Sequence, residues 1–218
     1  MKDILLTTVC NDEYALGGLV MLYSMKKNVK DFDKCDVKVY YNDIISPLSD
    51  ENKENFKAIG DNISLEYVDE SKYLDAKVPY HQGRSAGSHA AYLTLESFGE
   101  YDYDKVIMFD VDMLCIGDFS ELFTSDYHLG IFNRNTGFVV LGKKIRNSNI
   151  YNGLISHIKH HNGDFMDQGI INKALGHLFQ PLPHIYNEYK PIYNFNEKTK
   201  IIHWAHFDYI KPWTLDYW

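Results

Sequence analysis

Two aspartates, Asp110 and Asp112, follow a short apolar run and are spaced in a way that suits metal chemistry. The run Val106-Ile107-Met108-Phe109 predicts a buried strand that ends at Asp110. Ligands in open α/β sheets bind beyond the carboxyl ends of the strands, and a turn at such an end lets both carboxylates meet one cation. Two carboxylates suit a hard divalent ion, Mg²⁺ or Mn²⁺, that also holds a diphosphate.

Two alternatives compete with a metal site at this position. Asp is common in turns, so the pair can be purely structural. Phosphatases of the haloacid-dehalogenase type also carry Asp-x-Asp after an apolar strand, and Asp110 would then be the nucleophile, with 163–167 as the later acidic motif. That nucleophile usually lies near the start of its domain, whereas three expected strand–helix units precede Asp110 here.

The elements that must position these residues alternate along the chain. Strands are expected at Ile4–Val9, Val37–Tyr41, Ser64–Val68, Lys105–Phe109, Gly137–Leu141 and Ile201–Trp204. Helices are expected at Tyr14–Lys27, from a Ser49 cap to about Ile59, and at Ser85–Phe98, Ile145–His161 and Asp167–Leu175. This alternation predicts an α/β fold with a mostly parallel sheet flanked by helices, in one domain over residues 1–218.

Composition limits the partners and the compartment. The chain has 22 Lys and Arg against 30 Asp and Glu, a net charge of -8, which argues against a nucleic-acid or anionic-membrane surface. No run of about 18 apolar residues occurs, so no membrane span is expected. Cys10, Cys35 and Cys115 form no CxxC pair, so we expect reduced cysteines and a cytoplasmic protein. No GxGxxG motif indicates a dinucleotide cofactor.

Other polar residues follow predicted strands. Asn11 and Tyr14 come after the first strand and can hydrogen-bond and stack a uracil, while Thr8 can line its edge. Taken alone, these residues are better explained as a helix cap and a core tyrosine. His203 closes the last strand, and an imidazole beside two carboxylates accommodates Mn²⁺ better than Mg²⁺. Lys211 is a suitable cation for a diphosphate.

Taken in order, these segments resemble glycosyltransferase family 8, the glycogenin-like enzymes, over nearly the whole chain. The matching segments are Thr7–Tyr14, Asp110–Asp112, Asn135–Gly137 with Asp164–Gln168, and His203 with Lys211–Trp213. The resemblance implies a GT-A-type fold, a UDP-sugar donor and Mn²⁺. It also implies transfer of a hexose, with retention of anomeric configuration, to a hydroxyl of a carbohydrate or protein acceptor.

The resemblance also assigns roles residue by residue. It implies metal ligation by Asp110, Asp112 and His203. It implies nucleotide or diphosphate binding by Thr8, Asn11, Tyr14, Val111 and Lys211. It implies contacts to the donor sugar by Arg84, Asp110, Asn135, Asp164, Asp167 and Gln168, with Asp167 and Gln168 closest to the chemistry.

The sequence departs from the family pattern in two places. Thr94 stands where the family carries a Lys or Arg aimed at the donor, and Arg84 or His89 are the candidates to compensate. This departure keeps open a non-catalytic nucleotide-sugar-binding module as a further alternative. Between His203 and Lys211 the spacing is longer than in the family, and His206 there is either an additional ligand or a packing residue.

One segment raises the question of self-modification. Leu182–Asn187 resembles a glycogenin segment that precedes its sugar-accepting tyrosine. Tyr193 lies nearest the matching position and Tyr189 precedes it, so either is a candidate acceptor.

Overall fold

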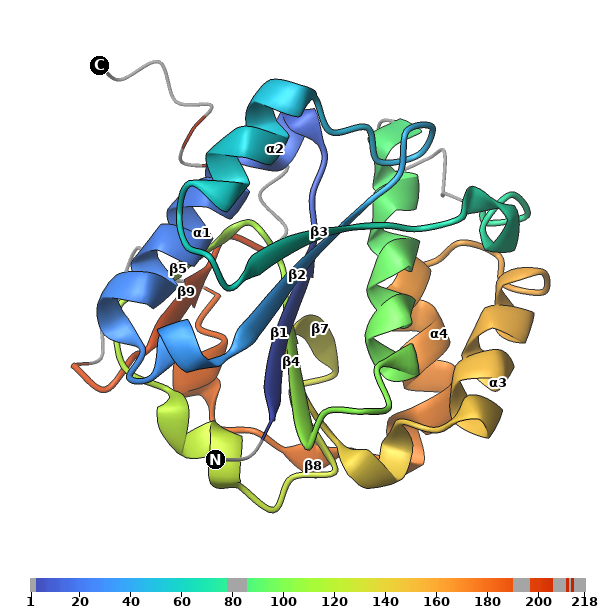
Figure 1. The fold of residues 1–218 in the computed structure, drawn as a ribbon. Helices are drawn as coiled ribbons and strands as arrows, with labels where there is room; N and C mark the ends of the chain where they lie inside the picture. Colours follow the sequence, from blue (N-terminus) through green and yellow to red (C-terminus); the bar gives the residue numbers. More distant parts are fainter. Residues whose placement is uncertain (1–2, 78–85, 190–196, 206–210, 212, 214–218) are drawn as a thin grey trace.

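A seven-stranded sheet forms the centre of the molecule (Figure 1). The computed structural model describes residues 3–77, 86–189, 197–205, 211 and 213. The strand order is β3-β2-β1-β4-β7-β6-β8. These strands are β1 (Ile4–Val9), β2 (Asp36–Tyr41), β3 (Ile63–Tyr67), β4 (Lys105–Phe109), β6 (Leu129–Phe132), β7 (Asn135–Gly142) and β8 (Gln180–Pro181).

The sheet is mostly parallel, as the sequence predicted. Strand β1 pairs in parallel with β2 and β4, β2 with β3, and β6 with β8. Strand β7 runs antiparallel to both β4 and β6. The expected strand Gly137–Leu141 lies within β7, whereas its hairpin partner β6 and the short β8 were not predicted.

Helices cover both faces of the sheet (Figure 1). The longer ones are α1 (Ala15–Asn28), α2 (Asp50–Lys57), the 3₁₀ helix η5 (Ala86–Gly99), α3 (Ser148–Ile158) and α4 (Met166–Leu175). Short 3₁₀ turns are η1 (Asp12–Tyr14), η2 (Phe32–Lys34), η3 (Glu70–Lys72), η6 (Ser120–Thr124), η7 (Lys143–Ile145), η8 (Gly176–Leu178) and η9 (His184–Tyr186). Helices α1 and α2 lie on one face, and η5, α3 and α4 on the other.

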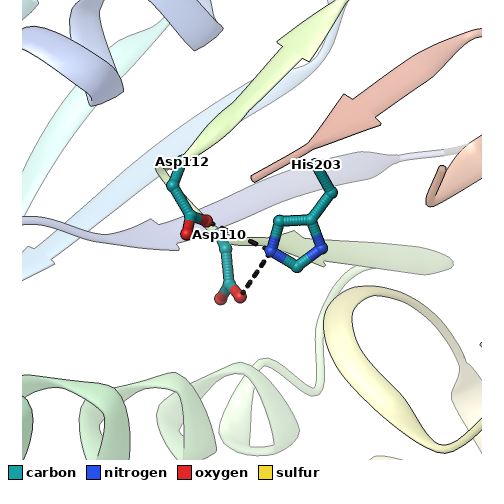
Figure 2. A group of neighbouring side chains, drawn as sticks. All are labelled: Asp110, Asp112 and His203. Carbon is teal, nitrogen blue, oxygen red and sulfur yellow. Dashed lines mark ion pairs between the residues drawn. The ribbon is translucent and has the colours of Figure 1, made fainter. Parts of the chain in front are cut away.

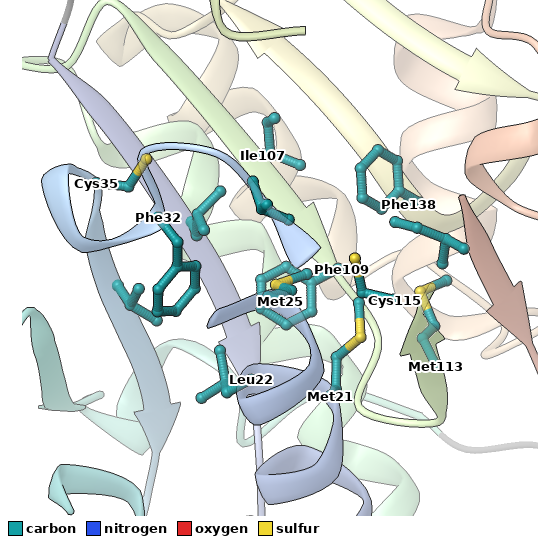
Figure 3. Close-up of a cluster of buried hydrophobic side chains, with 14 of the residues drawn as sticks. Met21, Leu22, Met25, Phe32, Cys35, Ile107, Phe109, Met113, Cys115 and Phe138 are labelled. Carbon is teal, nitrogen blue, oxygen red and sulfur yellow. The ribbon is translucent and has the colours of Figure 1, made fainter. Parts of the chain in front are cut away.

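The core is divided between these two faces because the central strands are apolar on both sides. In β1, Ile4 and Leu6 pack into the cluster under α1, which Figure 3 shows, whereas Leu5 packs into the cluster under η5. All three side chains are buried. Strand β4, which pairs with β1, is likewise buried at every residue. This burial holds its carboxyl end, and hence Asp110, in a fixed position.

A second, two-stranded sheet lies beside the main one (Figure 1). Strand β5 (Met113–Cys115) pairs antiparallel with β9 (Ile201–His203), and Met113 is opposite His203. The expected strand Ile201–Trp204 therefore forms as β9, but it pairs with an unpredicted strand outside the main sheet.

The starts of two helices, α3 and α2, can be compared with the prediction. The expected helix Ile145–His161 begins only at Ser148, because the Asn147 side chain accepts a hydrogen bond from the Ile150 amide and caps α3 there. The Ser49 cap of α2 is confirmed, since its hydroxyl accepts from the Asn52 amide.

The cysteine and membrane expectations can be compared with the structure directly. Cys10, Cys35 and Cys115 are all free and buried. No helix within the described ranges is long and apolar enough to cross a membrane.

Candidate active site

Asp110, Asp112 and His203 meet at the carboxyl end of β4 (Figure 2). One ligand atom from each side chain lies within 4.8 Å of the others. The distances from His203 Nε2 are 3.6 Å to Asp110 Oδ2 and 3.2 Å to Asp112 Oδ1. The structure thus brings together the three residues that the sequence analysis chose as metal ligands.

The backbone fixes each of these residues. Asp110 follows β4, and its amide donates to the Gly137 carbonyl at 2.8 Å. Asp112 precedes β5, and its carbonyl accepts from the Trp204 amide at 3.0 Å. Because β5 and β9 are paired, Asp112, which directly precedes β5, is held close to His203 at the end of β9, although the two are far apart in sequence.

Charge in the cluster is unevenly distributed. Burial and the neighbouring Asp112 raise the pKa of Asp110 to about 6. Burial also disfavours ionisation of Asp112, but His203 and Lys211 outweigh it and hold the pKa of that carboxyl well below its usual range. The Lys211 amine lies 2.6 Å from Asp112 Oδ2 and donates to the Trp204 carbonyl at 2.9 Å.

The donor set fits a divalent cation. Asp112 Oδ1 is buried, and no described N–H or O–H group donates to it with hydrogen-bond geometry. A buried carboxylate oxygen without a donor is costly unless a cation meets it. Two carboxylates and an imidazole form a ligand set for a metal such as Mn²⁺.

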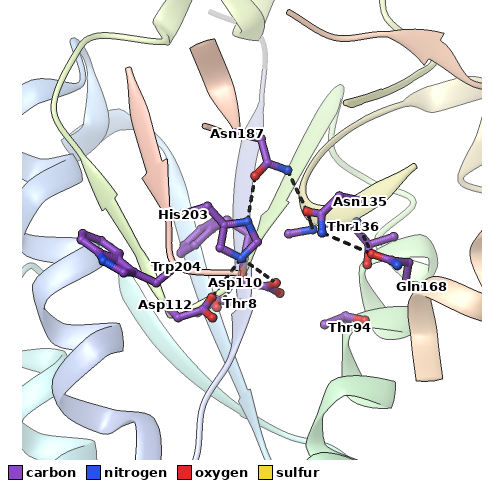
Figure 4. Close-up of polar contacts among 12 residues, drawn as sticks. Thr8, Thr94, Asp110, Asp112, Asn135, Thr136, Gln168, Asn187, His203 and Trp204 are labelled. Carbon is purple, nitrogen blue, oxygen red and sulfur yellow. Dashed lines mark hydrogen bonds and ion pairs between the residues drawn. The ribbon is translucent and has the colours of Figure 1, made fainter. Parts of the chain in front are cut away.

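We call Asp110, Asp112 and His203 the metal cluster, for the cation that these side chains could bind. Beside it, Asn135 and Gln168 form an amide pair (Figure 4). The Asn135 amide group donates to Gln168 Oε1 at 3.3 Å, and the Thr136 backbone N–H donates to the same oxygen at 3.2 Å. The Gln168 oxygen is therefore occupied by two donors, which orients its NH₂ group. Thr136 lies in the segment Asn135–Gly137, in which the sequence analysis assigned a role to Asn135 alone.

Asp167 is buried in the first turn of α4, with two hydroxyls against it. Its Oδ2 lies 3.2 Å from the hydroxyl oxygens of both Thr94 and Thr136. Burial and the negative charge of Asp110 raise the pKa of Asp167 to about 7. Asp167 does not cap α4, because Phe165 occupies the cap position of that helix.

Left-handed backbone conformations directly precede Asn135 and Asp167. Asn133 and Arg134, with φ of 47° and 62°, come just before Asn135. Phe165 and Met166, with φ of 56° and 46°, come just before Asp167. Non-glycine residues seldom adopt this region, and such strain is kept where a site must be held in one geometry.

The expected nucleotide-binding residues lie at the same edge of the sheet. The Thr8 hydroxyl donates to the Phe109 carbonyl at 2.7 Å, which joins the ends of β1 and β4. Asn11 caps η1 by accepting from the Tyr14 amide, as the structural alternative for it proposed. The Tyr14 ring meets the Trp213 ring edge-on at a centroid distance of 6.1 Å.

Val111 is buried between the two aspartates, against α1. A Cβ atom built on Gly17 would lie 2.9 Å from the Val111 carbonyl oxygen and would overlap the Trp213 ring. The close packing of Gly17, Val111 and Trp213 therefore holds α1 and Trp213 against the segment between Asp110 and Asp112.

Other residues predicted for the site make their described hydrogen bonds away from Asp110, Asp112 and His203. Asp164 lies in the loop before α4, and its carboxylate accepts from the Asn162 amide group at 2.6 Å. His89 Nε2 lies 3.0 Å from the Ala76 carbonyl oxygen. Arg84, His206 and Tyr193 fall outside the described residues.

Tyr189, the other candidate acceptor, can be placed. Its ring lies near those of His203 and Phe132, at centroid distances of 6.1 Å and 5.5 Å. It therefore packs against the side of a metal-ligand candidate.

Asn187 is the site residue that the sequence analysis missed. It is fully buried, its Oδ1 lies 2.7 Å from His203 Nδ1, and its Nδ2 donates to Asn135 Oδ1 at 2.8 Å (Figure 4). Its signal in the sequence was its place at the end of Leu182–Asn187, the segment that resembles one in glycogenin.

Several solved structures that share this fold are glycosyltransferases. The galactosyltransferase LgtC, solved with donor and acceptor sugar analogs, gives a TM-score of 0.75 at 19% identity, covering 97% of this chain and 90% of LgtC. Mouse xyloside xylosyltransferase 1 gives 0.58 at 13% identity, covering 93% and 97%. The bifunctional glycosyltransferase WbbM gives 0.71 at 19% identity, covering 94% of this chain but only 46% of WbbM.

At these identities the structural likeness establishes a GT-A-type fold. A comparison with curated proteins gave no match. The sequence itself matches the model of glycosyl transferase family 8 over residues 5–134, more than half of the chain. With the fold and the motif order in agreement, this chain belongs to glycosyltransferase family 8.

Proposed function

We propose that this protein transfers a hexose from a UDP-sugar to an acceptor hydroxyl, with a divalent metal and with retention of anomeric configuration. The proposed unit of function is one GT-A domain over residues 1–218. The observation that carries the proposal is the cluster of Asp110, Asp112 and His203 at the end of β4, beside the Asn135–Gln168 amide pair.

The donor would lie across the carboxyl ends of β1 and β4. Its nucleoside would contact four residues at this edge: Thr8, Asn11, Tyr14 and the backbone of Val111. Mn²⁺ or Mg²⁺ held by Asp110, Asp112 and His203 would neutralise the charge that develops on the departing diphosphate.

Lys211 would bind the diphosphate as a point charge. Its amine contacts Asp112 Oδ2 in the structure, so donor binding would require it to share or exchange that contact.

The sugar would contact Asn135, Asp167 and Gln168, with Asp110, Asp164 and Arg84 as further proposed contacts. Because the Gln168 oxygen already accepts two hydrogen bonds, its NH₂ group is the part suited to a sugar oxygen. The raised pKa of Asp167 and its two hydroxyl neighbours suit it to hold the sugar rather than to attack it.

The raised pKa of Asp167 and its contacts with two hydroxyls favour front-face transfer. The acceptor oxygen would bond to the anomeric carbon on the face from which the diphosphate departs. As the bond from that carbon to the diphosphate oxygen breaks, the acceptor proton would pass to the leaving diphosphate. A covalent glycosyl-enzyme would instead need an ionised carboxylate at the anomeric carbon, and Asp167 is the named candidate.

Binding and product analysis test this function. Calorimetry should detect UDP binding that strengthens with Mn²⁺. Transfer assays with UDP-glucose, UDP-galactose and UDP-xylose cover the sugars suggested by the family resemblance and by the names of LgtC and the mouse enzyme. Hydrolysis of an aryl phosphate through Asp110, without UDP binding, would favour the phosphatase alternative.

A binding module without turnover is the second candidate, and Thr94 is the observation that favours it. Its hydroxyl contacts Asp167 at the position where the family carries a positive charge. Metal-dependent binding of UDP-sugars, with neither transfer nor donor hydrolysis across the panel, would select this alternative.

A further inference from the structure

We propose that Asn187 is a positioning residue that holds His203 in the tautomer protonated at Nδ1, so that the lone pair of Nε2 faces Asp110 and Asp112. The assignment follows from three hydrogen bonds that begin at a backbone amide. Its functional meaning, a ligand atom prepared for metal, rests on the proposed function.

The first step fixes the orientation of Asn135. The Gly137 backbone N–H can only donate, and it lies 2.9 Å from the atom placed as Asn135 Oδ1. The two ends of an asparagine amide are distinguished by their partners. The atom that faces Gly137 must therefore be the oxygen.

The second step carries this orientation to Asn187. Asn135 Oδ1 lies 2.8 Å from the near end of the Asn187 amide, so that end must be the NH₂ group. The opposite orientation would place two carbonyl oxygens against each other at hydrogen-bond distance. The Asn187 oxygen therefore points toward His203.

The third step sets the proton on the imidazole. Asn187 Oδ1 only accepts, and it lies 2.7 Å from His203 Nδ1, so Nδ1 must carry hydrogen. In the neutral ring, Nε2 then presents a lone pair 3.2 Å from Asp112 Oδ1 and 3.6 Å from Asp110 Oδ2. Lone pairs converging on one point call for a shared cation, and an imidazole ligand is commonly oriented through its other nitrogen in this way.

Burial makes Asn187 difficult to replace. Its exposed fraction is 0%, and that of His203 is 2%, so bulk water cannot readily substitute for the lost carbonyl. The same chain of amides continues from Asn135 to Gln168. Asn187 thus links the metal cluster with the proposed sugar pocket.

NMR of ¹⁵N-histidine-labelled, metal-free protein tests the tautomer directly. The pH is raised until the His203 ring holds one proton, and His203→Gln assigns its signal. We expect the remaining proton on Nδ1 in the wild type. In Asn187→Leu, which keeps the side-chain size but removes both hydrogen bonds, the proton should move to Nε2, where Asp112 and Asp110 can accept it.

A second variant separates the two ends of Asn187. Asn187→Asp keeps an acceptor for Nδ1–H but replaces the donor to Asn135. It should retain the Nδ1–H tautomer and near-wild-type Mn²⁺ affinity while raising the KM for the UDP-sugar. Asn187→Leu should weaken Mn²⁺ binding by about 10- to 100-fold.

Asn42→Leu is the matched control, because Asn42 is also fully buried and donates to the Val68 carbonyl, in a different network. It should change neither the tautomer nor Mn²⁺ binding. A wild-type ring with its proton on Nε2, or an Asn187→Leu protein with an unchanged tautomer and Mn²⁺ affinity, would overturn the proposal.

The tautomer measurement needs only the folded wild type, so a variant that fails to fold does not prevent the test. If UDP binding and transfer are both absent but Nδ1–H is present and lost only in Asn187→Leu, the proposed function fails while the positioning role of Asn187 stands.

Discussion

Gly137 approaches the ring of His203 so closely that no side chain fits between them. A Cβ atom on Gly137 would overlap ring atom Cε1 and would lie 2.8 Å from Nδ1. The same backbone donates to Asn135 and accepts from the Asp110 amide. Gly137 therefore contacts residues of both the metal cluster and the amide pair.

We expect Gly137→Ala to displace His203 and to weaken Mn²⁺-dependent UDP binding at least 10-fold, the scale seen when a ligand loses its support. Gly153→Ala is the control, because no atom lies within 4 Å of a Cβ built in that helix. Alanine there should raise stability by about 0.5–1 kcal/mol without altering binding. Unchanged binding in Gly137→Ala would contradict the close approach.

Asp112 should be essential for metal-supported transfer. Asp112→Asn removes a buried carboxylate that faces His203, and activity should fall on the order of 10²-fold or more. Excess EDTA should have a comparable effect that Mn²⁺ reverses. Asp126→Asn, at an exposed aspartate, should retain activity. Full activity in EDTA would exclude a metal-dependent mechanism.

Replacing Lys211 should change the affinities for the metal and for the nucleotide in opposite directions. Its amine contacts Oδ2 of Asp112 in the structure, so its positive charge competes with a metal for the charge of that carboxylate. In Lys211→Met, calorimetry should detect tighter binding of Mn²⁺ alone and weaker binding of UDP, each by about 10-fold, or roughly 1.4 kcal/mol. Weaker binding of both would show that Lys211 supports the cluster itself. Lys57→Met, at an exposed lysine, is the control.

Asp167 should make the folding stability of the metal-free protein depend on pH. Its pKa rises from the ordinary 3.8 to about 7, so between these values the folded state holds a proton that the unfolded state releases. The contribution of Asp167 to stability should therefore fall as pH rises from 4 to 7.

Urea unfolding in EDTA at several pH values tests this sign. Asp167→Asn should gain stability relative to the wild type as pH rises, by at most about 4 kcal/mol at 1.36 kcal/mol per pKa unit. A difference that is flat with pH, or that changes in the opposite direction, would contradict the raised pKa.

The sequence predicted that Asp110 and Asp112 lie together because the signals for them are local: they follow an apolar strand whose end lies at the edge of the sheet where ligands bind. His203 closes another short strand, but its place beside them was implied by the family resemblance, since that strand, β9, pairs outside the main sheet. The parallel half of the sheet was equally predictable, since continuous apolar runs indicate strands that are buried on both faces.

What the sequence could not provide depends on contacts between distant segments. Asn187 carries no periodic signal, and its role arises only where its amide meets Asn135 and His203. Strand β6 is four residues long and is stabilised by its hairpin with β7. Tertiary pairing of this kind outweighs local propensity.

The pairing of β5 with β9 has a consequence for the order of folding. Met113 and His203 are direct neighbours across this small sheet, but the chain between them also contains β6, β7, α3 and α4. Contacts of high sequence separation carry a loop-closure cost and tend to form late. During synthesis, the carboxylates would thus emerge and join the sheet well before the imidazole reaches them, so a folding intermediate would contain most of the main sheet but only two of the three ligands.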